Sequence, residues 1–234
     1  RTHTDAVMGF SAIEKGNILH QALAFLWQHL QTQRQLLSID NSALTLLVSD
    51  GVNVEINNII KHKRHHFGDE IIQLEAERQT ELILKWLAYE KTRQPFAVKC
   101  IEESYKINIK GYNLHLRLDR IDEINPVVQV SAEPYQPEPY QPEPYRPEPY
   151  HLIIDYKTGQ CSLNDWAGEH PNDPQLPFYL CVNNLAANQH NVDNPSFDNN
   201  LDYFCSLNAI AFGQINVKQQ TLMGLHHESF ALPE

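Results

Sequence analysis

The first clear hydrophobic pattern lies near the start of the chain. Leu19, Leu23, Leu26 and Leu30 follow one another at intervals of four and three residues. These intervals align the four side chains along one face of an α-helix. The pattern predicts an amphipathic helix over residues 12–30, with His20 beside its apolar face.

A second helical pattern covers residues 69–93, where apolar positions such as Ile72, Leu82 and Trp86 alternate with charged ones. The helix is expected to close at Gln94-Pro95, because a residue before proline disfavours helical backbone. Between the two helices, we interpret residues 31–68 as irregular or short helical structure.

Strand-forming residues dominate the next part of the chain and return near its end. The predicted strands cover residues 96–101, 105–109, 114–124, 151–156, 203–212 and 221–225. Gly111, Tyr112 and Asn113 separate two of them, as a hairpin turn would. A further helix is predicted over residues 175–185, followed by an Asn-rich loop to about residue 200.

These elements predict an α/β fold in which helices flank a mixed central sheet. The length of 234 residues suits one domain over residues 1–234. Because the chain begins at Arg1 rather than at methionine, we expect it to be a C-terminal piece of a longer protein.

Residues 131–150 form a five-residue repeat of the type Gln-Pro-Glu-Pro-Tyr. Alternate prolines remove backbone donors and restrict φ, which is incompatible with a helix or an inner strand. We interpret the repeat as an insertion at a hairpin tip; the less favoured alternative is a ligand for an aromatic groove. It separates the two strands that carry the candidate carboxylates described below.

Composition narrows the functional classes. No apolar run approaches the roughly 20 residues of a membrane-spanning helix, and the first residues lack the layout of a secretory signal. We therefore expect a cytoplasmic protein without membrane contact.

The four cysteines form no C-x-x-C pair, so buried free thiols are favoured over zinc ligands or a disulfide framework. A net charge of -11 argues against tight nonspecific DNA binding by this chain alone.

Candidate chemistry is concentrated in two of the predicted strands. Side chains two residues apart on a strand share a face, so Asp155 and Lys157 project together, opposite Ile154 and Tyr156. Asp119 offers a second carboxylate from residues 114–124. Two converging carboxylates suit Mg²⁺ or Mn²⁺. Taken alone, however, a D-x-K pattern is more often an ordinary ion pair on an exposed strand.

This residue set fits phosphodiester hydrolysis. A carboxylate-bound divalent ion can lower the pKa of its water and clamp phosphate oxygens. Lys157 would then hold the attacking water or stabilise charge in the transition state.

Four motifs connect these residues to a known family. They are Gly16-Asn-Ile-Leu-His20, Leu118-Asp-Arg-Ile-Asp122, Ile154-Asp-Tyr-Lys-Thr-Gly159 and Gln175-Leu-Pro-Phe-Tyr179. In this order they resemble the G-x-x-x-H helix, first carboxylate strand, D-Y-K-[ST] strand and Q-x-x-x-Y helix of the RecB-like PD-(D/E)XK nucleases. That branch includes the nuclease domains of AddB-type helicase-nuclease subunits. The resemblance covers nearly the whole chain and implies a restriction-endonuclease-like core.

The resemblance implies a role for each matching residue. His20, Asp119 and Asp155 would bind the metal together with the backbone carbonyl of Tyr156, and Lys157 would be the catalytic lysine.

A second group of candidates surrounds this centre. Gln175 and Tyr179, one helical turn apart, would line the site and contact DNA or orient the lysine; a helix start with a packed aromatic is an equal alternative. Glu102 matches a glutamate of similar domains, although a surface charge is favoured.

Other charged residues have mainly structural interpretations. Asp122 is expected to pair with Arg120 or Arg117. The basic run at residues 61–66 could touch phosphates, although a solvated loop is favoured. Some related nucleases hold an iron-sulfur cluster with one early and three late cysteines; the late trio is missing, so we expect no cluster.

The resemblance thus implies a Mg²⁺- or Mn²⁺-dependent deoxyribonuclease, an exonuclease in DNA repair or recombination with a helicase-like domain or subunit as partner. Two alternatives remain. One is a catalytically silent DNA-binding or scaffolding module that keeps the fold. The other is a metal-dependent hydrolase of a different substrate, which a closed pocket would support.

Overall fold

The computed structural model describes residues 9–62, 68–109, 112–125, 148–166, 170–179 and 207–226. Its elements, in chain order, are α1 (Ala12–His29), α2 (Gln33–Ser38), α3 (Asn41–His62), α4 (Asp69–Glu90), β1 (Phe96–Ile109), β2 (Tyr112–Ile124), β3 (Tyr150–Lys157), the 3-10 turn η1 (Leu163–Trp166), β4 (Leu207–Ile215) and β5 (Gln220–His226). Residues 175–179 form a further short helical segment.

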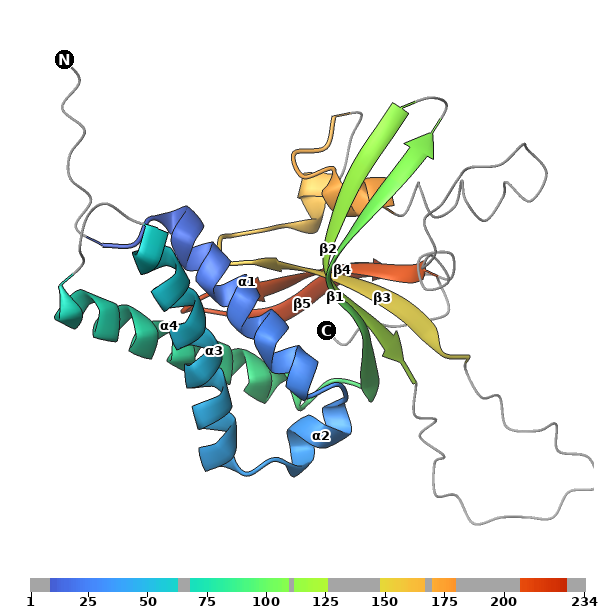
Figure 1. The fold of residues 1–234 in the computed structure, drawn as a ribbon. Helices are drawn as coiled ribbons and strands as arrows, with labels where there is room; N and C mark the ends of the chain where they lie inside the picture. The colour runs from blue at the N-terminus through green and yellow to red at the C-terminus, as the bar shows by residue number, and fades with distance from the viewer. Residues whose placement is uncertain are drawn as a thin grey trace, which may run out of the picture.

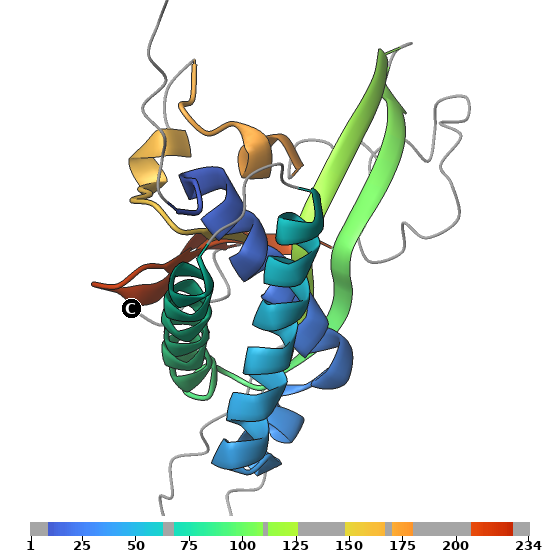
Figure 2. The same cartoon turned by 60° about the vertical axis from the view of Figure 1, so that its left-hand side comes forward.

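The described strands form one mixed sheet in the order β1-β2-β3-β4-β5 (Figure 1). Neighbouring strands are antiparallel except for β3 and β4, which are parallel. Helices α1, α3 and α4 lie together on one side of the sheet, whereas η1 and residues 175–179 lie on the other (Figures 1 and 2). The predicted α/β fold, a mixed sheet flanked by helices, is confirmed.

Helix α1 forms the centre of the helical layer, as its hydrophobic spacing predicted. Ser11 and Glu14 make a capping box: the Glu14 amide donates to Ser11 Oγ (3.3 Å), and the Ser11 amide donates to Glu14 Oε2 (2.8 Å). Leu19, Leu23 and Leu26 are completely buried. Burial of this apolar face against the sheet and α3 stabilises α1.

The interpretation of residues 31–68 as irregular or short helical structure holds for the six-residue helix α2 but was wrong for residues 41–62, which form the 22-residue helix α3. Its buried face consists of Leu44, Val48, Val52 and Ile56, spaced by four residues. Valine and isoleucine favour strands, and Gly51 weakens a helix, so local propensity is poor. A Cβ at position 51 would lie 2.9 Å from Phe25 Cδ1, which shows how closely α3 approaches α1. Packing against α1 therefore outweighs the weak local preference.

The predicted strands at 96–101 and 105–109 are one strand, β1, with an irregularity between Val98 and Cys100. The expected hairpin with β2 is present, but Tyr112 and Asn113 belong to β2 rather than to the turn. Tyr150, the last residue of the repeat, begins β3. The predicted helix at 69–93 ends at Glu90. Strands β1, β2 and β3 thus extend further than propensity alone indicated, because pairing with a neighbouring strand stabilises their ends.

Several predictions lie wholly or partly outside the described residues. These are the repeat up to residue 147, the basic run from residue 63, the continuation of the 175–185 helix, the Asn-rich loop, residues 203–206, Cys181 and Cys205. Cys100 is buried and Cys161 half-buried, and both are free thiols. Among the described helices, none combines the length and apolar character needed to cross a membrane.

Candidate active site

The site is built where strands β2 and β3 separate. Their pairing runs from Ile124 and Tyr150 as far as Arg120 and Ile154. Just beyond that point, the Tyr156 amide donates a hydrogen bond to Asp119 Oδ2 at 2.8 Å. Asp119 is therefore held between the two diverging strands, with only 9% of its surface exposed.

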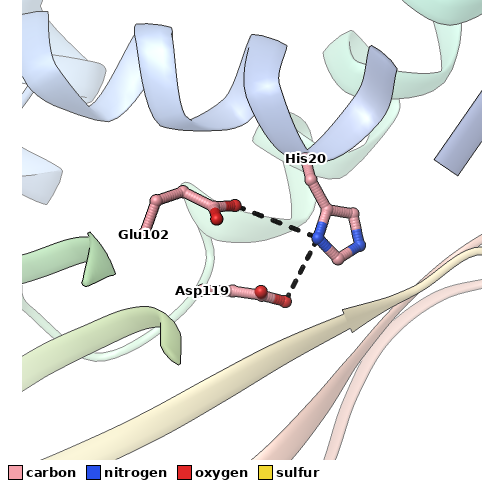
Figure 3. A group of neighbouring side chains, drawn as sticks. All are labelled: His20, Glu102 and Asp119. Carbon is pink, nitrogen blue, oxygen red and sulfur yellow. Dashed lines mark ion pairs between the residues drawn. The ribbon is translucent and has the colours of Figure 1, made fainter. Parts of the chain in front are cut away.

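His20 reaches this point from α1 (Figure 3). Its Nε2 lies 3.0 Å from the carbonyl oxygen of Tyr156. Its Nδ1 lies 3.4 Å from Asp119 Oδ2 and 3.9 Å from Glu102 Oε1. The two nitrogens of one imidazole ring thus face the backbone of β3 on one side and two carboxylates on the other.

The surroundings of His20 favour its charged form. Burial lowers the pKa of the ring, but the hydrogen bond to Asp119 and the charges of Asp119, Glu102 and Asp155 outweigh it, so the pKa is raised overall. A protonated imidazole has two N–H donors. It can therefore donate to the Tyr156 carbonyl and to Asp119 at the same time.

Glu102 is placed by an unusual backbone conformation. Its φ of 50° makes it the one non-glycine residue with positive φ among those described. Such a conformation costs about 1–2 kcal/mol for an L-residue and persists only where its surroundings enforce it. Arg117 binds Glu102 Oε2 through Nε (2.9 Å) and Nη2 (2.6 Å), while Oε1 faces His20.

The ligand atoms of His20, Glu102 and Asp119 all lie within 4.8 Å of one another. They come from α1, β1 and β2, three elements that are separate in sequence. Glu102, which sequence reasoning treated as a minor candidate, is therefore a full member of this donor group. Asp155, which the resemblance placed among the ligands, is not part of it.

Asp155 and Lys157 lie side by side next to the donor group, on one face of β3. Lys157 Nζ is 2.9 Å from Asp155 Oδ2 and 2.8 Å from Asp173 Oδ2. The sequence analysis missed Asp173, which lies just before the helix predicted over residues 175–185. The available signal was an acidic residue two positions before the Q-x-x-x-Y motif.

The two charges in this pair respond differently to their surroundings. Burial and repulsion by Asp119 raise the pKa of Asp155 to about 6, although Lys157 lowers it. Burial lowers the pKa of Lys157, but Asp155 and Asp173 more than compensate, so the pKa is raised overall. Lys157 forms ion pairs with two carboxylates and remains positively charged at neutral pH. For Asp155, the attraction of Lys157 and the weaker attraction of His20 do not outweigh burial and the repulsion by Asp119.

Gln175 and Tyr179 contact each other, as their one-turn separation allows. Gln175 Nε2 donates to Tyr179 Oη at 3.0 Å, and Tyr179 Oη donates to the carbonyl oxygen of Arg117 at 2.8 Å. The short helical segment is thereby attached to β2 two residues before Asp119. Both side chains line a cleft that also includes Lys157.

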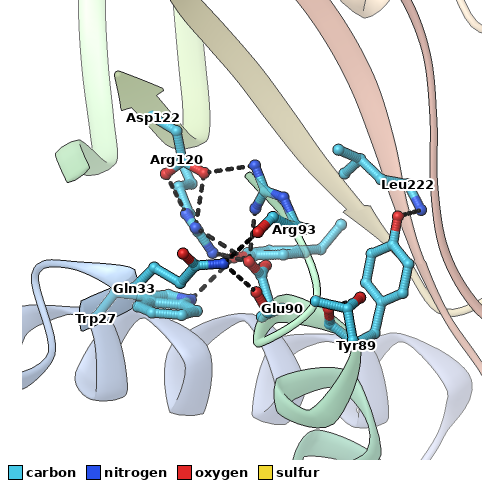
Figure 4. A network of polar contacts seen from close by, with 10 residues as sticks. Trp27, Gln33, Tyr89, Glu90, Arg93, Arg120, Asp122 and Leu222 are labelled. Carbon is cyan, nitrogen blue, oxygen red and sulfur yellow. Dashed lines mark hydrogen bonds and ion pairs between the residues drawn. The ribbon is translucent and has the colours of Figure 1, made fainter. Parts of the chain in front are cut away.

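A buried charge cluster lies behind the site, on the helical side of the same strands (Figure 4). We call Glu90, Arg93, Arg120 and Asp122 the buried quartet. Arg120 donates to Asp122 Oδ1 through Nε (2.6 Å) and to Glu90 Oε1 through Nη1 (2.9 Å). Arg93 donates to Glu90 Oε2 (2.6 Å) and to Asp122 Oδ2 (3.0 Å). Two positive and two negative charges therefore neutralise one another.

The quartet also contacts Tyr156 from behind. Arg120 Nη1 donates to Tyr156 Oη at 3.1 Å, and Trp27 Nε1 donates to the same oxygen at 3.1 Å. The Arg120 guanidinium stacks 4.0 Å from the centroid of the Trp27 ring. Tyr156 is thus held by its side chain while its backbone orients His20 and Asp119.

This arrangement tests one expectation about Asp122. Its predicted structural pairing with Arg120 is confirmed, and Arg93 is an additional partner. Arg117, the alternative partner, binds Glu102 instead.

No protein-family model matches the chain, and no curated protein does either. The function must therefore be inferred from the site and the motifs themselves.

Proposed function

We propose that the chain is a divalent-metal-dependent deoxyribonuclease of the RecB-like PD-(D/E)XK type. The observation that carries this proposal is the convergence of His20, Glu102 and Asp119 within 4.8 Å, with Lys157 beside them on the strand of the D-Y-K motif. The mixed sheet with its flanking helices supports a PD-(D/E)XK core. The four motifs meet around one point, as expected if they serve a common site.

The donors present fit a hard divalent cation. Glu102 and Asp119 offer carboxylate oxygens, and His20 adds Nδ1, which would bind an ion after losing its proton. The Tyr156 carbonyl lies at the other ring nitrogen, Nε2, and orients the ring. Oxygen donors suit Mg²⁺ and Mn²⁺, and an imidazole favours Mn²⁺ of the two. Bound there, such an ion supplies a water of lowered pKa and a clamp on phosphate oxygens.

Lys157 has a defined task in this proposal. Its ammonium lies between Asp155 and Asp173, at 2.9 and 2.8 Å. An ammonium has three N–H donors, so Lys157 would also donate to a phosphate oxygen or to the attacking water. A fixed positive charge in a half-buried place stabilises the charge that develops on the phosphate during hydrolysis.

The wider biological role rests on the resemblance alone. We infer an exonuclease in DNA repair or recombination that works in the bacterial cytoplasm, with a helicase-like domain or subunit as partner. The net charge of -11 supports dependence on such a partner for tight DNA binding.

The test is degradation of end-labelled linear DNA in Mn²⁺ or Mg²⁺, with a chelator control. Asp119→Ala and Lys157→Ala are compared with Lys99→Ala, a matched control because Lys99 also forms an ion pair (3.2 Å to Glu123) and is similarly exposed, 27% against 28% for Lys157. We expect Lys99→Ala to cut normally and the other two variants to lose about 100-fold or more in rate.

The products separate the remaining alternatives. Mononucleotides or short fragments released from the labelled end indicate an exonuclease, whereas internal fragments indicate an endonuclease. A folded wild-type chain that binds Mn²⁺ and DNA but cuts nothing would favour the silent scaffolding module.

A further inference from the structure

A cleft of about 630 Å³ opens beside Lys157. One wall belongs to β2, through His115 and Leu116. The other wall belongs to residues 172–179, which lie next to the β1–β2 hairpin (Figures 1 and 2). The volume falls within the range of about 300–1,000 Å³ that is usual for small-molecule sites.

The lining of the cleft combines an apolar floor with an exposed aromatic side chain. Leu116 and Tyr179 are almost completely buried, at 4% and 5% exposure. Phe178 keeps 39% of its surface exposed, although it is a large apolar residue. Gln175 and Phe178 share one face of the short helical segment, since residues three apart are neighbours on a helix. His115 is exposed on the opposite wall.

We propose that this cleft is a base-binding subsite in which an unpaired nucleobase stacks on Phe178, with His115 on the other side. The proposal rests on the nuclease function proposed above. The base would belong to the strand whose phosphate lies at Lys157, because Lys157 forms part of the same cleft. Stacking on an aromatic side chain tolerates any base, since every base has a π-face.

The acidic composition of the chain supports a contact to the base in addition to contacts with phosphates. Proteins that hold nucleic acid through phosphates alone need many Lys and Arg contacts, whereas this chain has 18 Lys and Arg against 29 Asp and Glu. In the cleft itself Lys157 is accompanied by the carboxylate of Asp173. A neutral stacking contact adds affinity that does not depend on positive charge.

The base must be unpaired to enter. Within a duplex, both faces of a base are covered by its neighbours, and the base reaches a protein pocket only by leaving the stack. The subsite therefore selects single strands and frayed ends over intact duplex.

A second groove, of about 610 Å³, lies between α3 and α4. Its lining includes Asp69, Glu77 and Glu81 and contains none of the candidate site residues. Three carboxylates repel a phosphate backbone, so this groove is a poorer candidate for nucleic acid.

Binding of fluorescein-labelled oligo-dT of 20 nucleotides, measured by anisotropy in Ca²⁺ to avoid cleavage, tests the proposal. The comparison ligand is the same strand with abasic sites at every position. We expect Phe178→Ala to weaken oligo-dT binding about 10-fold, to leave abasic binding unchanged, and to be rescued by Phe178→Trp. Leu225→Ala is the matched control, because Leu225 is another exposed large apolar residue (51%) and does not line the cleft.

Equal binding of the intact and abasic strands by the wild-type chain would overturn the subsite, as would a failure to bind either. An unchanged affinity in Phe178→Ala would do the same. Cleavage is read separately: base-dependent binding without metal-dependent cleavage would leave the subsite standing and overturn the nuclease function. Metal-dependent cleavage without base-dependent binding would leave the nuclease function standing and overturn the subsite.

Discussion

The backbone amide of Tyr156 donates a 2.8 Å hydrogen bond to Asp119 Oδ2, at the point where β2 and β3 cease to pair. The carbonyl of the same Tyr156 lies 3.0 Å from His20 Nε2. One residue of β3 therefore orients two candidate metal ligands through its backbone alone. Asp119 and His20 are thereby fixed relative to each other by one peptide unit of β3.

Asp119→Asn should separate the structural role of Asp119 from its charge. The amide oxygen of asparagine can still accept the Tyr156 hydrogen bond, so we expect little loss of thermal stability. Affinity for Mn²⁺, measured by titration calorimetry, should fall more than about 100-fold, beyond the effect usual for an outer-shell change. Glu123→Gln is the control, because it removes a carboxylate from the same strand outside the donor group. Wild-type affinity in Asp119→Asn would refute the assignment of Asp119.

Glu102→Gly should weaken metal binding without lowering the stability of the fold. Glycine adopts positive φ without strain, while the exposed Arg117 pair that is lost contributes about 0–1 kcal/mol. We therefore expect the free energy of unfolding in urea to stay unchanged or to rise by up to about 1 kcal/mol. Mn²⁺ binding should weaken in the same variant.

Glu103→Gly provides the control for Glu102→Gly, because Glu103 is the next residue of β1 and has no positive φ. Glycine in a strand interior costs stability, and the change also removes the hydrogen bond from Tyr105 Oη to Glu103 Oε2 (2.7 Å), so a loss of about 1–2 kcal/mol is expected there. A similar loss at both positions would show that the backbone at Glu102 is not strained.

Asp155→Asn should stabilise the protein in a chelating buffer at neutral pH. The pKa of Asp155 is about 6 in the folded chain, against an ordinary value of 3.8. Since the folded state binds this proton more tightly, ionisation of Asp155 opposes folding at pH 7.5 and not below about pH 4. We expect a gain of about 1–3 kcal/mol at pH 7.5, because the raised pKa already includes the opposing attraction of Lys157.

The pH dependence is the distinguishing readout for Asp155. Urea unfolding of both proteins should show a constant gain above about pH 6.5 and a shrinking gain as the pH falls from 6 to 4. A gain that does not change with pH would mean that burial of the charge is not its cause. DNA cleavage should be lost in the same variant.

Arg120→Met should destabilise the protein strongly. It leaves two carboxylates, Glu90 and Asp122, with Arg93 as the one cation of the quartet, and both carboxylates are completely buried. Removing one member of a buried ion pair costs about 3–5 kcal/mol. Lys85→Met, which breaks an exposed ion pair with Glu81, should cost less than about 1 kcal/mol in the same urea titration. Equal costs would show that the quartet contributes no more than a surface pair.

Local patterns predicted the parts of this protein that depend on neighbours in sequence. The four-and-three spacing of leucines is sufficient for α1, because residues on one helical face must be buried together. Strand alternation likewise placed Asp155 and Lys157 on one face of β3. Both features follow from the repeat of a single element.

Tertiary structure decided the features that join distant elements. Helix α3 forms because its valines and isoleucine are buried against α1, and its local propensity argued against it. Glu102 enters the donor group because the register of β1 against β2 and a backbone of positive φ direct it there. The quartet joins the end of α4 to β2, with Glu90 and Arg120 30 positions apart in the chain. Register and packing are set by the whole core, whereas periodicity describes only one helix or strand at a time.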